Sequence, residues 1–358
     1  MNNSSAQTNT LAPPLDIELF RRLSEADGPS GFEGEIREIL RHRFAEAGGE
    51  ILEDRLGGVI GVRRGTADRP RIMLDCHTDE VGFIVRHITK DGFLRFLPLG
   101  SWPGDVLSAE RVRVMASGGK ISGMIGAIPP HHRTGKTALP ALESLYIDIG
   151  AESRDQVESW GIRIGTPIVP ATPFQLMRNP RRALGKAFDN RAGCALCVEA
   201  FQRAAGFAGT LYAAGSAQEE VGVRGAETTA ATIDPDLAIV FEGPPADDTP
   251  GFRREESQGA LGQGPQIRVI DRTAIIDPRL IERAIALARA AGIPFQLAAR
   301  ASGGTDAKAI HLHGRGTPTL VIGVPVRYAH SAAGCIDLGD CESALRLGLL
   351  LIDQLSRE

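Results

Sequence analysis

Residues 72–82 read IMLDCHTDEVG, and two patterns of the chain meet in this stretch. Residues 72–75 form a short, mostly apolar run that is typical of a buried strand, like the run at 59–62 before it. Apolar residues with helical spacing occupy about 16–48, interrupted by the glycine-containing turn GPSGFEG. Helices that alternate with short strands predict an α/β layer architecture for this part of the chain.

The periodicity changes after Gly82. From there to about Thr172, apolar residues alternate with polar ones and glycines are frequent, as in FIVRHITKDGFLRFLPLG at 83–100. This pattern predicts a small barrel or sandwich of antiparallel strands. From Gly185 onward, helical and strand runs alternate again. We therefore expect an α/β fold, a mixed sheet flanked by helices with an inserted small β-barrel. The α/β unit is expected at 15–80 plus 177–358, and the insert at 81–176.

The totals of the chain exclude several classes of protein. With 358 residues, 42% hydrophobic and 23% charged, it has an ordinary globular composition and is long for a single core. A formal net charge of -4 without long Lys or Arg runs argues against nucleic acid or a membrane surface as partner. No apolar stretch approaches the roughly 20 residues that span a bilayer. The polar residues 1–14 lack a secretion signal, so we expect a disordered N-terminus and a cytoplasmic protein.

The five cysteines are expected to be reduced thiols. Their number is odd, and no secretion signal accompanies them. Cys194 and Cys197 form a CxxC pair, which is compatible with redox or zinc chemistry. However, the pair lies in the apolar helical stretch GCALCVEAFQRAAG, where a free cysteine packs as a small hydrophobe, and core packing is the favoured interpretation.

Side chains that can bind a metal follow four predicted strands. They are His77 after IMLDC, Glu219 and Glu220 after TLYAAGSAQ, Glu242 after LAIVF, and His330 shortly after TLVIGVPV. Asp189 stands at the start of a predicted helix. Ligands of open α/β sheets bind beyond the carboxyl ends of the strands, so we expect these groups to converge. Imidazoles with carboxylates suit Zn, Co or Mn.

Each of these residues also has an ordinary structural interpretation. A single histidine after a strand is more often structural, and Glu219 with Glu220 could be a solvated loop pair. Asp189 could be only a helix N-cap, and Glu242 could pair with a nearby arginine. Their occurrence together, at four strand ends of one unit, favours the metal site.

At this point the chain resembles a known family. The segments HTDEVG, DNRAG, QEEVGVRGA, GGTDA and RYAHS occur in the order expected of the M42 metallo-aminopeptidases, which include glutamyl aminopeptidases and TET peptidases. The resemblance implies a zinc-exopeptidase-like catalytic unit and two divalent metal ions per subunit, Zn or Co, with Mn as an alternative. It also implies that the inserted barrel mediates dimer contacts, and that the homo-oligomer is a dimer or a dodecamer built from dimers.

The resemblance assigns roles to the individual residues. His77 resembles a ligand of the first metal and Asp79 the carboxylate that orients it, while Asp189 resembles the carboxylate that bridges both ions. Glu242 matches the other ligand of the first metal, although many relatives have Asp there. Glu220 and His330 match the ligands of the second metal. Glu219 matches the general base. The bond between Asp189 and Asn190 is expected to be cis.

The implied activity is removal of N-terminal residues from peptides by metal-activated water, with Glu219 as general base. The glycine-rich loop at Gly304, Thr305 and Asp306 is either a place of close substrate approach or an ordinary turn. A small-amide deacylase on the same scaffold is the nearest alternative. An endoglucanase-type glycoside hydrolase is disfavoured, because only 5% of residues are aromatic. A catalytically silent assembly protein would be expected to lack a ligand or the base. The preferred N-terminal residue and the metal remain open.

Overall fold

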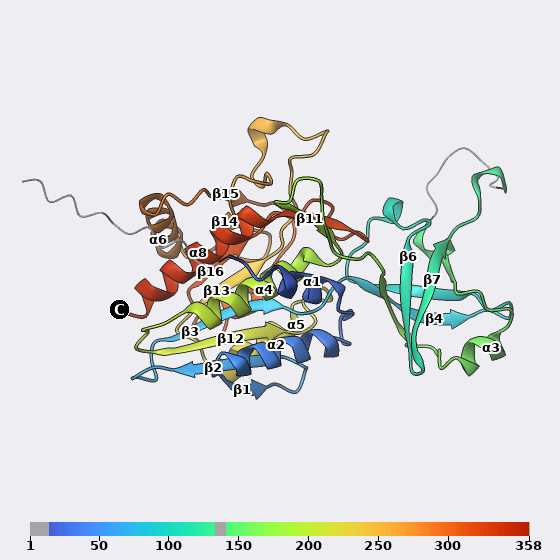
Figure 1. Ribbon diagram of the computed structural model, residues 1–358, viewed down its shortest axis with the longest axis horizontal. Helices are drawn as coiled ribbons and strands as arrows, with labels where there is room; N and C mark the ends of the chain where they lie inside the picture. Colours follow the sequence, from blue (N-terminus) through green and yellow to red (C-terminus); the bar gives the residue numbers. More distant parts are fainter. Residues whose placement is uncertain (1–13, 133–140, 358) are drawn as a thin grey trace, which may run out of the picture.

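The computed structural model describes residues 14–132 and 141–357. An eight-stranded mixed sheet forms the centre of the larger part (Figure 1). In spatial order its strands are β1 (Glu50–Glu53), β2 (Val59–Arg64), β12 (Thr210–Ser216), β3 (Arg71–His77), β13 (Leu237–Glu242), β16 (Thr319–Gly323), β14 (Gln266–Ile270) and β15 (Gln296–Ala299). The four central strands, β12, β3, β13 and β16, are mutually parallel. Their carboxyl ends therefore lie along one edge.

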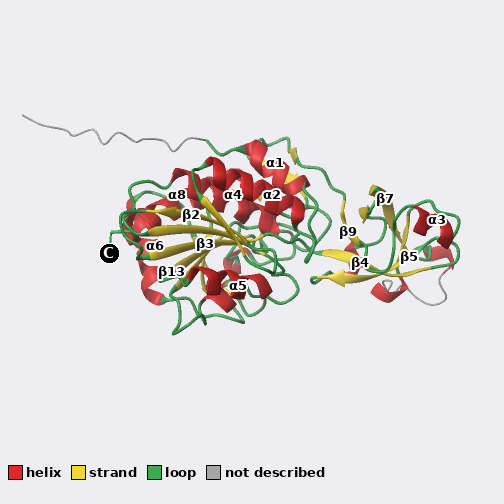
Figure 2. Ribbon diagram, turned by 90° about the horizontal axis from the view of Figure 1, so that it is seen from below, coloured by secondary structure: helices red, strands yellow, loops and turns green. Residues whose placement is uncertain are grey.

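Helices cover both faces of this sheet (Figure 2). One layer contains α1 (Ile17–Glu25), α2 (Gly34–Glu46), α4 (Phe188–Arg203) and α8 (Leu338–Leu355), with α6 (Pro278–Ala290) packed against α8 and β14. The other face carries α5 (Arg224–Ile233), which contacts the short α7 (Ala307–Ile310). The central strands are buried along almost their whole length, as their near-continuous apolar sequences require.

The insert folds as a closed barrel with a core of its own. Its strands, in barrel order, are β4 (Gly82–Ile88), β5 (Leu94–Leu99), β8 (Tyr146–Asp148), β7 (Gly119–Gly126), β6 (Arg111–Ala116) and β9 (Pro167–Pro170). The helix α3 (Arg154–Ser159) and the 3-10 turns Gly104–Val106, Pro130–His132 and Leu142–Ser144 lie in its connections. The buried apolar residues of the barrel form a cluster separate from that of the α/β part. The expected fold class is thus confirmed.

Several short elements have no counterpart in the sequence expectations. A small antiparallel sheet consists of β10 (Gln175–Leu176), β11 (Arg182–Gly185) and β17 (Gly334–Asp337). The 3-10 turn Arg254–Glu256 lies in the long connection between β13 and β14. Almost all of the expected disordered N-terminus, residues 1–13, lies outside the described residues. Within them, no helix is long and apolar enough to cross a membrane.

Buried charges join the barrel to the α/β part. Asp27, fully buried after α1, accepts a hydrogen bond from Nε of Arg113 on β6 at 2.8 Å and lies 2.9 Å from Nζ of Lys120 on β7. Nζ of Lys186, also fully buried, is 3.2 Å from the same carboxylate. Burial alone would raise the pKa of Asp27, but the Arg113 hydrogen bond and the charges of the two lysines hold it below its ordinary value. The junction is therefore a compensated charge cluster.

Candidate metal centre

The metal-binding side chains expected from the sequence converge at the carboxyl edge of the sheet. The strands β3 and β13 are parallel neighbours, and they end at His77 and Glu242. The strand β12 runs parallel to β3 and leads into the turn that carries Glu219 and Glu220. His330 follows β16 through a turn in which its own φ is 59°. The topology alone thus places four chain segments at one edge.

Asp189 lies between two histidine–glutamate pairs. Its Oδ1 is 3.2 Å from Nε2 of His77, and that nitrogen is 3.3 Å from Oε1 of Glu242. Its Oδ2 is 3.3 Å from Nε2 of His330, and that nitrogen is 3.4 Å from Oε2 of Glu220. Each carboxylate oxygen of Asp189 thus faces a different pair. Ligand atoms of His77, Asp189 and Glu220 all lie within 4.8 Å of one another.

The backbone at the start of α4 aims Asp189 at this position. The peptide bond between Asp189 and Asn190 is cis, which confirms the expectation from the family resemblance, and both residues have non-helical dihedral angles. The Asn190 side chain donates to the carbonyl oxygen of Phe241 at 2.8 Å, and its Oδ1 accepts from the backbone N–H of Gly193 at 3.0 Å. These bonds tie the helix start to the end of β13.

Asp79 holds both sides of the cluster together. Its carboxylate accepts hydrogen bonds from the backbone N–H groups of Glu219 at 2.9 Å and Glu220 at 3.1 Å, and from the hydroxyl of Ser30 at 2.5 Å. Nδ1 of His77 lies 3.2 Å from the backbone carbonyl oxygen of Asp79 and 3.4 Å from its Oδ1. These acceptors on Nδ1 leave Nε2, which faces Asp189, free to bind a metal. Asp79 therefore orients the imidazole and the two glutamates at once.

A residue of the barrel connection orients the other histidine. Nδ1 of His330 lies 2.9 Å from the carbonyl oxygen of Ser101, which follows β5. Nδ1 must donate in this contact, since a carbonyl oxygen only accepts, so Nε2 is again left facing the carboxylates. The neighbouring Gly100 has φ 81°, and a Cβ there would lie 2.6 Å from the Val81 side chain and 3.3 Å from Cβ of Glu220. The connection therefore fits closely against the cluster.

Mutual repulsion and burial make the carboxylates of the cluster hard to ionise. Burial raises the pKa of Glu219 to about 8, and the negative charge of Glu242 contributes to the rise. Burial likewise raises the pKa of Glu220 and of Glu242. Oε1 of Glu220 is buried and has no hydrogen-bond partner among the described residues. A buried carboxylate oxygen without a donor is costly, and a bound cation would remove that cost.

The pKa of the central carboxylate is lowered, whereas that of His330 is raised. Burial alone would raise the pKa of Asp189, but its hydrogen bonds with His330 and His77 hold it below its ordinary value. Burial would lower the pKa of His330, yet the contacts with Asp189 and Glu220 raise it to about 10. These groups attract positive charge to the centre of the cluster. Two imidazoles and three carboxylates, with nitrogen and oxygen donors only, fit Zn²⁺, Co²⁺ or Mn²⁺.

The cluster opens into a cavity of about 520 Å³. Glu219 lines this cavity, as do Gly304 and Thr305 of the glycine-rich loop. Asp306 does not reach it, because its side chain is fully buried behind the wall, and burial with the nearby charge of Asp75 raises its pKa. Of the three loop residues proposed for substrate contact, the structure thus brings two to the cavity.

Some cavity residues were not predicted from the sequence. Arg268, Arg300 and Lys308 line it together with Ser101. Arg268 lies on β14, and Arg300 follows β15, two strands that the sequence interpretation did not identify. Neither arginine belongs to a recognisable motif, so only the fold brings them to the site. Their charge could have been noticed only after the two strands had been placed in the sheet.

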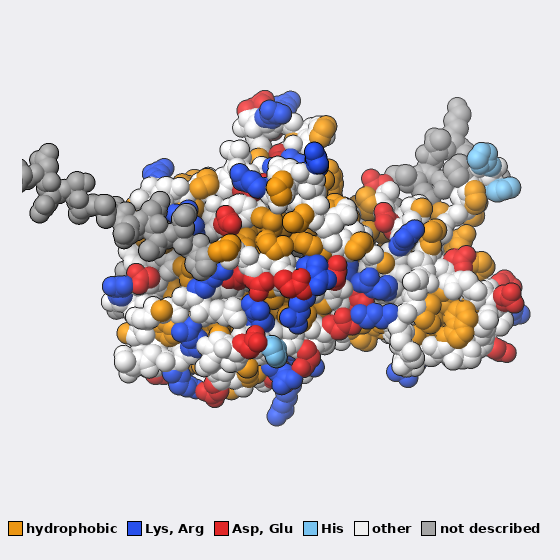
Figure 3. Space-filling view, viewed as in Figure 1, with side chains coloured by type: hydrophobic (Ala, Val, Ile, Leu, Met, Phe, Trp, Pro, Cys, Tyr) orange, Lys and Arg blue, Asp and Glu red, His pale blue; other side chains and the backbone are white. Residues whose placement is uncertain are grey.

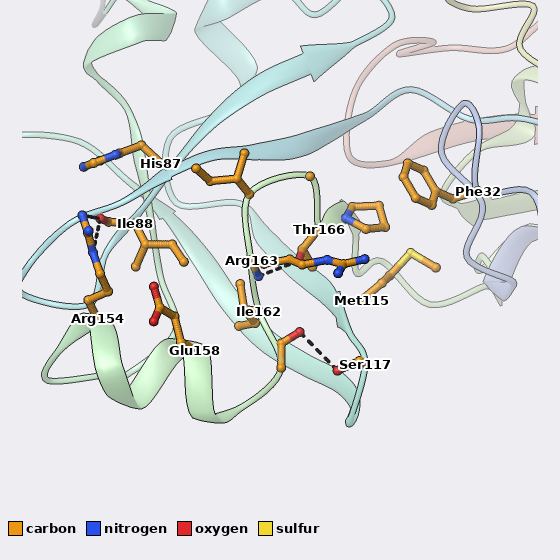
Figure 4. A pocket seen from close by; sticks show the side chains of 14 residues that line it. Phe32, His87, Ile88, Met115, Ser117, Arg154, Glu158, Ile162, Arg163 and Thr166 are labelled. Atoms are coloured by element: carbon orange, nitrogen blue, oxygen red, sulfur yellow. Dashed lines mark hydrogen bonds between the residues drawn. The ribbon is translucent and has the colours of Figure 1, made fainter.

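A second cavity, of about 840 Å³, lies between the barrel and Phe32 of the α/β part (Figure 4). Its walls include Met115, Glu158 and Ile162, and Arg154 there donates to the carbonyl oxygen of Ile88. It is larger than the cavity at the strand ends. However, no group of three or more metal-binding side chains was found there among the described residues, so the chemistry is assigned to the smaller cavity.

The cysteines take no part in the cluster. All five are buried and free, as expected from the sequence. The thiol of Cys76 lies 3.4 Å from the carbonyl oxygen of Ala214, and that of Cys194 lies 3.1 Å from the carbonyl oxygen of His77. Burial raises the pKa of both thiols, which keeps them protonated and poor metal ligands.

Comparisons with known proteins identify the family of this chain. The model of the M42 glutamyl aminopeptidase family matches residues 57–347. The chain is 37% identical to the putative aminopeptidase FrvX of Escherichia coli (93% of this chain, 94% of the relative) and 35% identical to glutamyl aminopeptidase of Lactococcus lactis (96% and 98%). It is also 32% identical to lysyl aminopeptidase of Pyrococcus furiosus (95% and 98%).

Solved structures give the same result. A TET aminopeptidase from the archaeon Thaumarchaeota archaeon SCGC AB-539-E09 superimposes with a TM-score of 0.92 at 42% identity, over 95% of this chain and 96% of that chain. The TET1 peptidase of Pyrococcus horikoshii, which can assemble into a tetrahedron or a large octahedral shell, has a TM-score of 0.81 at 29% identity, over 93% and 98%. The chain therefore belongs to the M42 family of aminopeptidases, which are metal-dependent hydrolases.

Proposed function

We propose that this chain removes N-terminal residues from peptides with two divalent metal ions, Zn or Co, with Mn as an alternative. The observation that carries the proposal is the position of Asp189 between two histidine–glutamate pairs. His77 and Glu242 would hold one ion with Oδ1 of Asp189, and His330 and Glu220 the other with Oδ2. When bound, such ions acidify a shared water and polarise a carbonyl group.

Glu219 is the proposed general base. It lines the cavity beside the cluster but contacts neither histidine in the way that Glu220 and Glu242 do, so its carboxylate stays available for proton transfer. It accepts a proton from the attacking water and returns it to the leaving amine. Asp79 is a positioning residue, since it holds the backbone of Glu219 and the ring of His77.

The acidic character of the cavity explains the restriction to chain ends. A free α-amino group is positively charged, and the carboxylates of the cluster attract it into a cavity of about 520 Å³. Gly304 and Thr305 offer backbone where a peptide can approach. Gly304 itself packs against Thr273, since a Cβ there would lie 2.8 Å from the Thr273 side chain. A larger residue would push this part of the wall out of place.

Two alternative activities are less well supported. A small-amide deacylase could use the same water. However, the relatives are named as aminopeptidases, which supports a peptide substrate for this chain. A glycoside hydrolase needs aromatic platforms for sugar rings. The described lining of the cavity contains no Phe, Tyr or Trp, and both tryptophans, Trp102 and Trp160, are partly buried against the barrel core.

The barrel is proposed to mediate contacts between subunits. We divide the chain into a catalytic domain, 15–80 plus 177–358, and a dimerisation domain, 81–176. Apolar side chains gather on the barrel surface in Figure 3, and Leu97, Met124 and Ile164 are exposed there. The shells formed by the Pyrococcus horikoshii relative support a homo-oligomer built from such dimers. Sedimentation velocity tests this, since a monomer at micromolar concentration contradicts it.

Substitution of the proposed base tests the activity. Glu219→Gln keeps the shape of the side chain and should retain both metal ions while turnover falls by about 100-fold or more. Metal content by mass spectrometry and hydrolysis of aminoacyl anilides give the two readouts. The matched control is Glu227→Gln, which changes an exposed glutamate on α5. Full activity of Glu219→Gln removes this residue from the role of base.

A further inference from the structure

Part of the cavity lining is cationic. It contains Arg268, Arg300 and Lys308, which together we call the cationic wall. The remaining lining is small or neutral and includes Pro244, Thr273 and Ser302, with no Leu, Ile, Phe or Met among the described residues. A large apolar side chain would meet only small apolar residues here, such as Val223 and Pro244.

Both arginines are held in place and still have free donors. Nη1 of Arg268 donates to Asp271 at 3.3 Å, and Nη1 of Arg300 donates to Asp247 at 2.8 Å. Nε of Arg268 and Nη2 of Arg300 are buried without a hydrogen-bond partner among the described residues. The Arg268 side chain is only 5% exposed. A buried guanidinium donor without an acceptor costs free energy, which an incoming acceptor removes.

The ion pairs of the two arginines lie outside the metal centre. In the described residues, neither forms an ion pair with a carboxylate of the cluster, because each pairs with an aspartate outside it. Two divalent ions would engage the carboxylates of the cluster, whereas the arginines keep donors that no described side chain uses. The cationic wall therefore presents positive charge to a substrate side chain in the cavity.

We propose that the cationic wall makes this enzyme selective for acidic N-terminal residues, glutamate or aspartate. The substrate carboxylate accepts hydrogen bonds from the free donors of Arg268 and Arg300, and the exposed Lys308 adds attraction at the mouth. Membership of the family does not decide this preference, since its relatives include both a glutamyl and a lysyl aminopeptidase. The inference rests on the proposed aminopeptidase activity and names its substrate class.

Glutamyl and glutaminyl anilides test the inference, because they differ in charge and hardly in shape. A charged hydrogen bond in the cavity predicts a kcat/KM for the glutamyl substrate about 10- to 100-fold above that for the glutaminyl one. Leucyl and lysyl anilides should be poorer still. Arg300→Gln should lower the glutamyl-to-glutaminyl ratio by about 10-fold, and Lys308→Gln by about 2- to 5-fold, because Lys308 is exposed to solvent.

The control is Arg315→Gln, which removes a positive charge from an exposed residue that does not line the cavity, and the ratio should stay unchanged. Calorimetric binding of free glutamate and glutamine gives a readout without turnover, with the same order of affinities expected. Better hydrolysis of leucyl or lysyl anilide by the wild type overturns the selectivity but leaves the aminopeptidase standing. A glutamyl-to-glutaminyl ratio that is unchanged in both Arg300→Gln and Lys308→Gln also overturns the selectivity and leaves the aminopeptidase standing. A metal-loaded protein that hydrolyses none of the four anilides overturns the aminopeptidase itself.

Discussion

Replacement of Asp79 by asparagine should weaken metal binding without removing a metal ligand. The wild-type carboxylate accepts from the backbone N–H of Glu219 through Oδ1, and from that of Glu220 and the Ser30 hydroxyl through Oδ2. An amide group has one oxygen, so either orientation turns an NH₂ group toward a backbone N–H. The orientation with NH₂ toward Ser30 is favoured, because a hydroxyl can also accept, and it leaves the N–H of Glu220 without a partner.

The size of the effect follows from these contacts. One orphaned buried N–H costs about 1–3 kcal/mol in unfolding free energy. Loss of the negative charge beside Nδ1 of His77 makes Nε2 a weaker ligand, and such a change behind a metal-binding histidine lowers metal affinity or activity by about 10- to 100-fold. Asp79→Asn should therefore need correspondingly more free metal for half-maximal activity.

Titration of activity against buffered free Zn²⁺ or Co²⁺ measures this shift, and chemical denaturation measures the stability loss. Ser30→Ala is the matched control, since it removes one donor to the same carboxylate but keeps its charge, and its metal requirement should change less. If Asp79→Asn has the wild-type metal requirement, Asp79 does not orient the cluster, and the connection drawn here between the HTDEVG segment and the two glutamates fails.

Three further predictions concern the metal centre and the charged junction at Asp27. His77→Ala should lower the bound metal by one ion per subunit, and an unchanged stoichiometry by elemental analysis contradicts its assignment. Chelation should lower the melting temperature, because the buried carboxylates lose their counter-charge. The free energy of unfolding should fall by about 2.7 kcal/mol when metal at 100 times its dissociation constant is removed. Because its folded-state pKa lies below that of the unfolded chain, Asp27 stabilises the protein at neutral pH, and this contribution is lost as the pH falls below about 4. In chelated protein, Asp27→Asn should thus reduce the loss of unfolding free energy between pH 7 and pH 3. If the variant loses as much unfolding free energy over this range as the wild type, the stabilising role of Arg113 and Lys120 is contradicted.

The parts of the fold with strong local patterns could be predicted from the sequence. The apolar run before His77 and the change of periodicity at Gly82 were enough to predict an α/β sheet with an inserted barrel. The strands β14 and β15 were not identified, because their sequences, QIRVI and QLAA, are short and include polar residues at buried or half-buried positions. Their neighbours in space come from distant parts of the chain, which local patterns do not reveal.

The same distinction holds for the site. The convergence of the side chains that follow the strands could be predicted, because parallel strands share an edge. The roles of Ser101 and the cationic wall could not, since a carbonyl oxygen has no sequence signature and Arg268 and Arg300 look like ordinary surface charges. For the loop that contains Asp306, the sequence left substrate contact and an ordinary turn open, and in the structure the Asp306 side chain is buried and does not line the cavity.

The contact between Ser101 and His330 has a consequence for the evolution and engineering of this chain. Because a carbonyl group of the insert fixes the tautomer of an imidazole that we propose as a metal ligand, the insert is not an independent module under this proposal. A version trimmed to the sheet and its helices would keep its hydrophobic core, yet one imidazole would rotate freely. Natural grafts of other inserts at this point must supply an equivalent acceptor, and a designed graft should begin from that single atom.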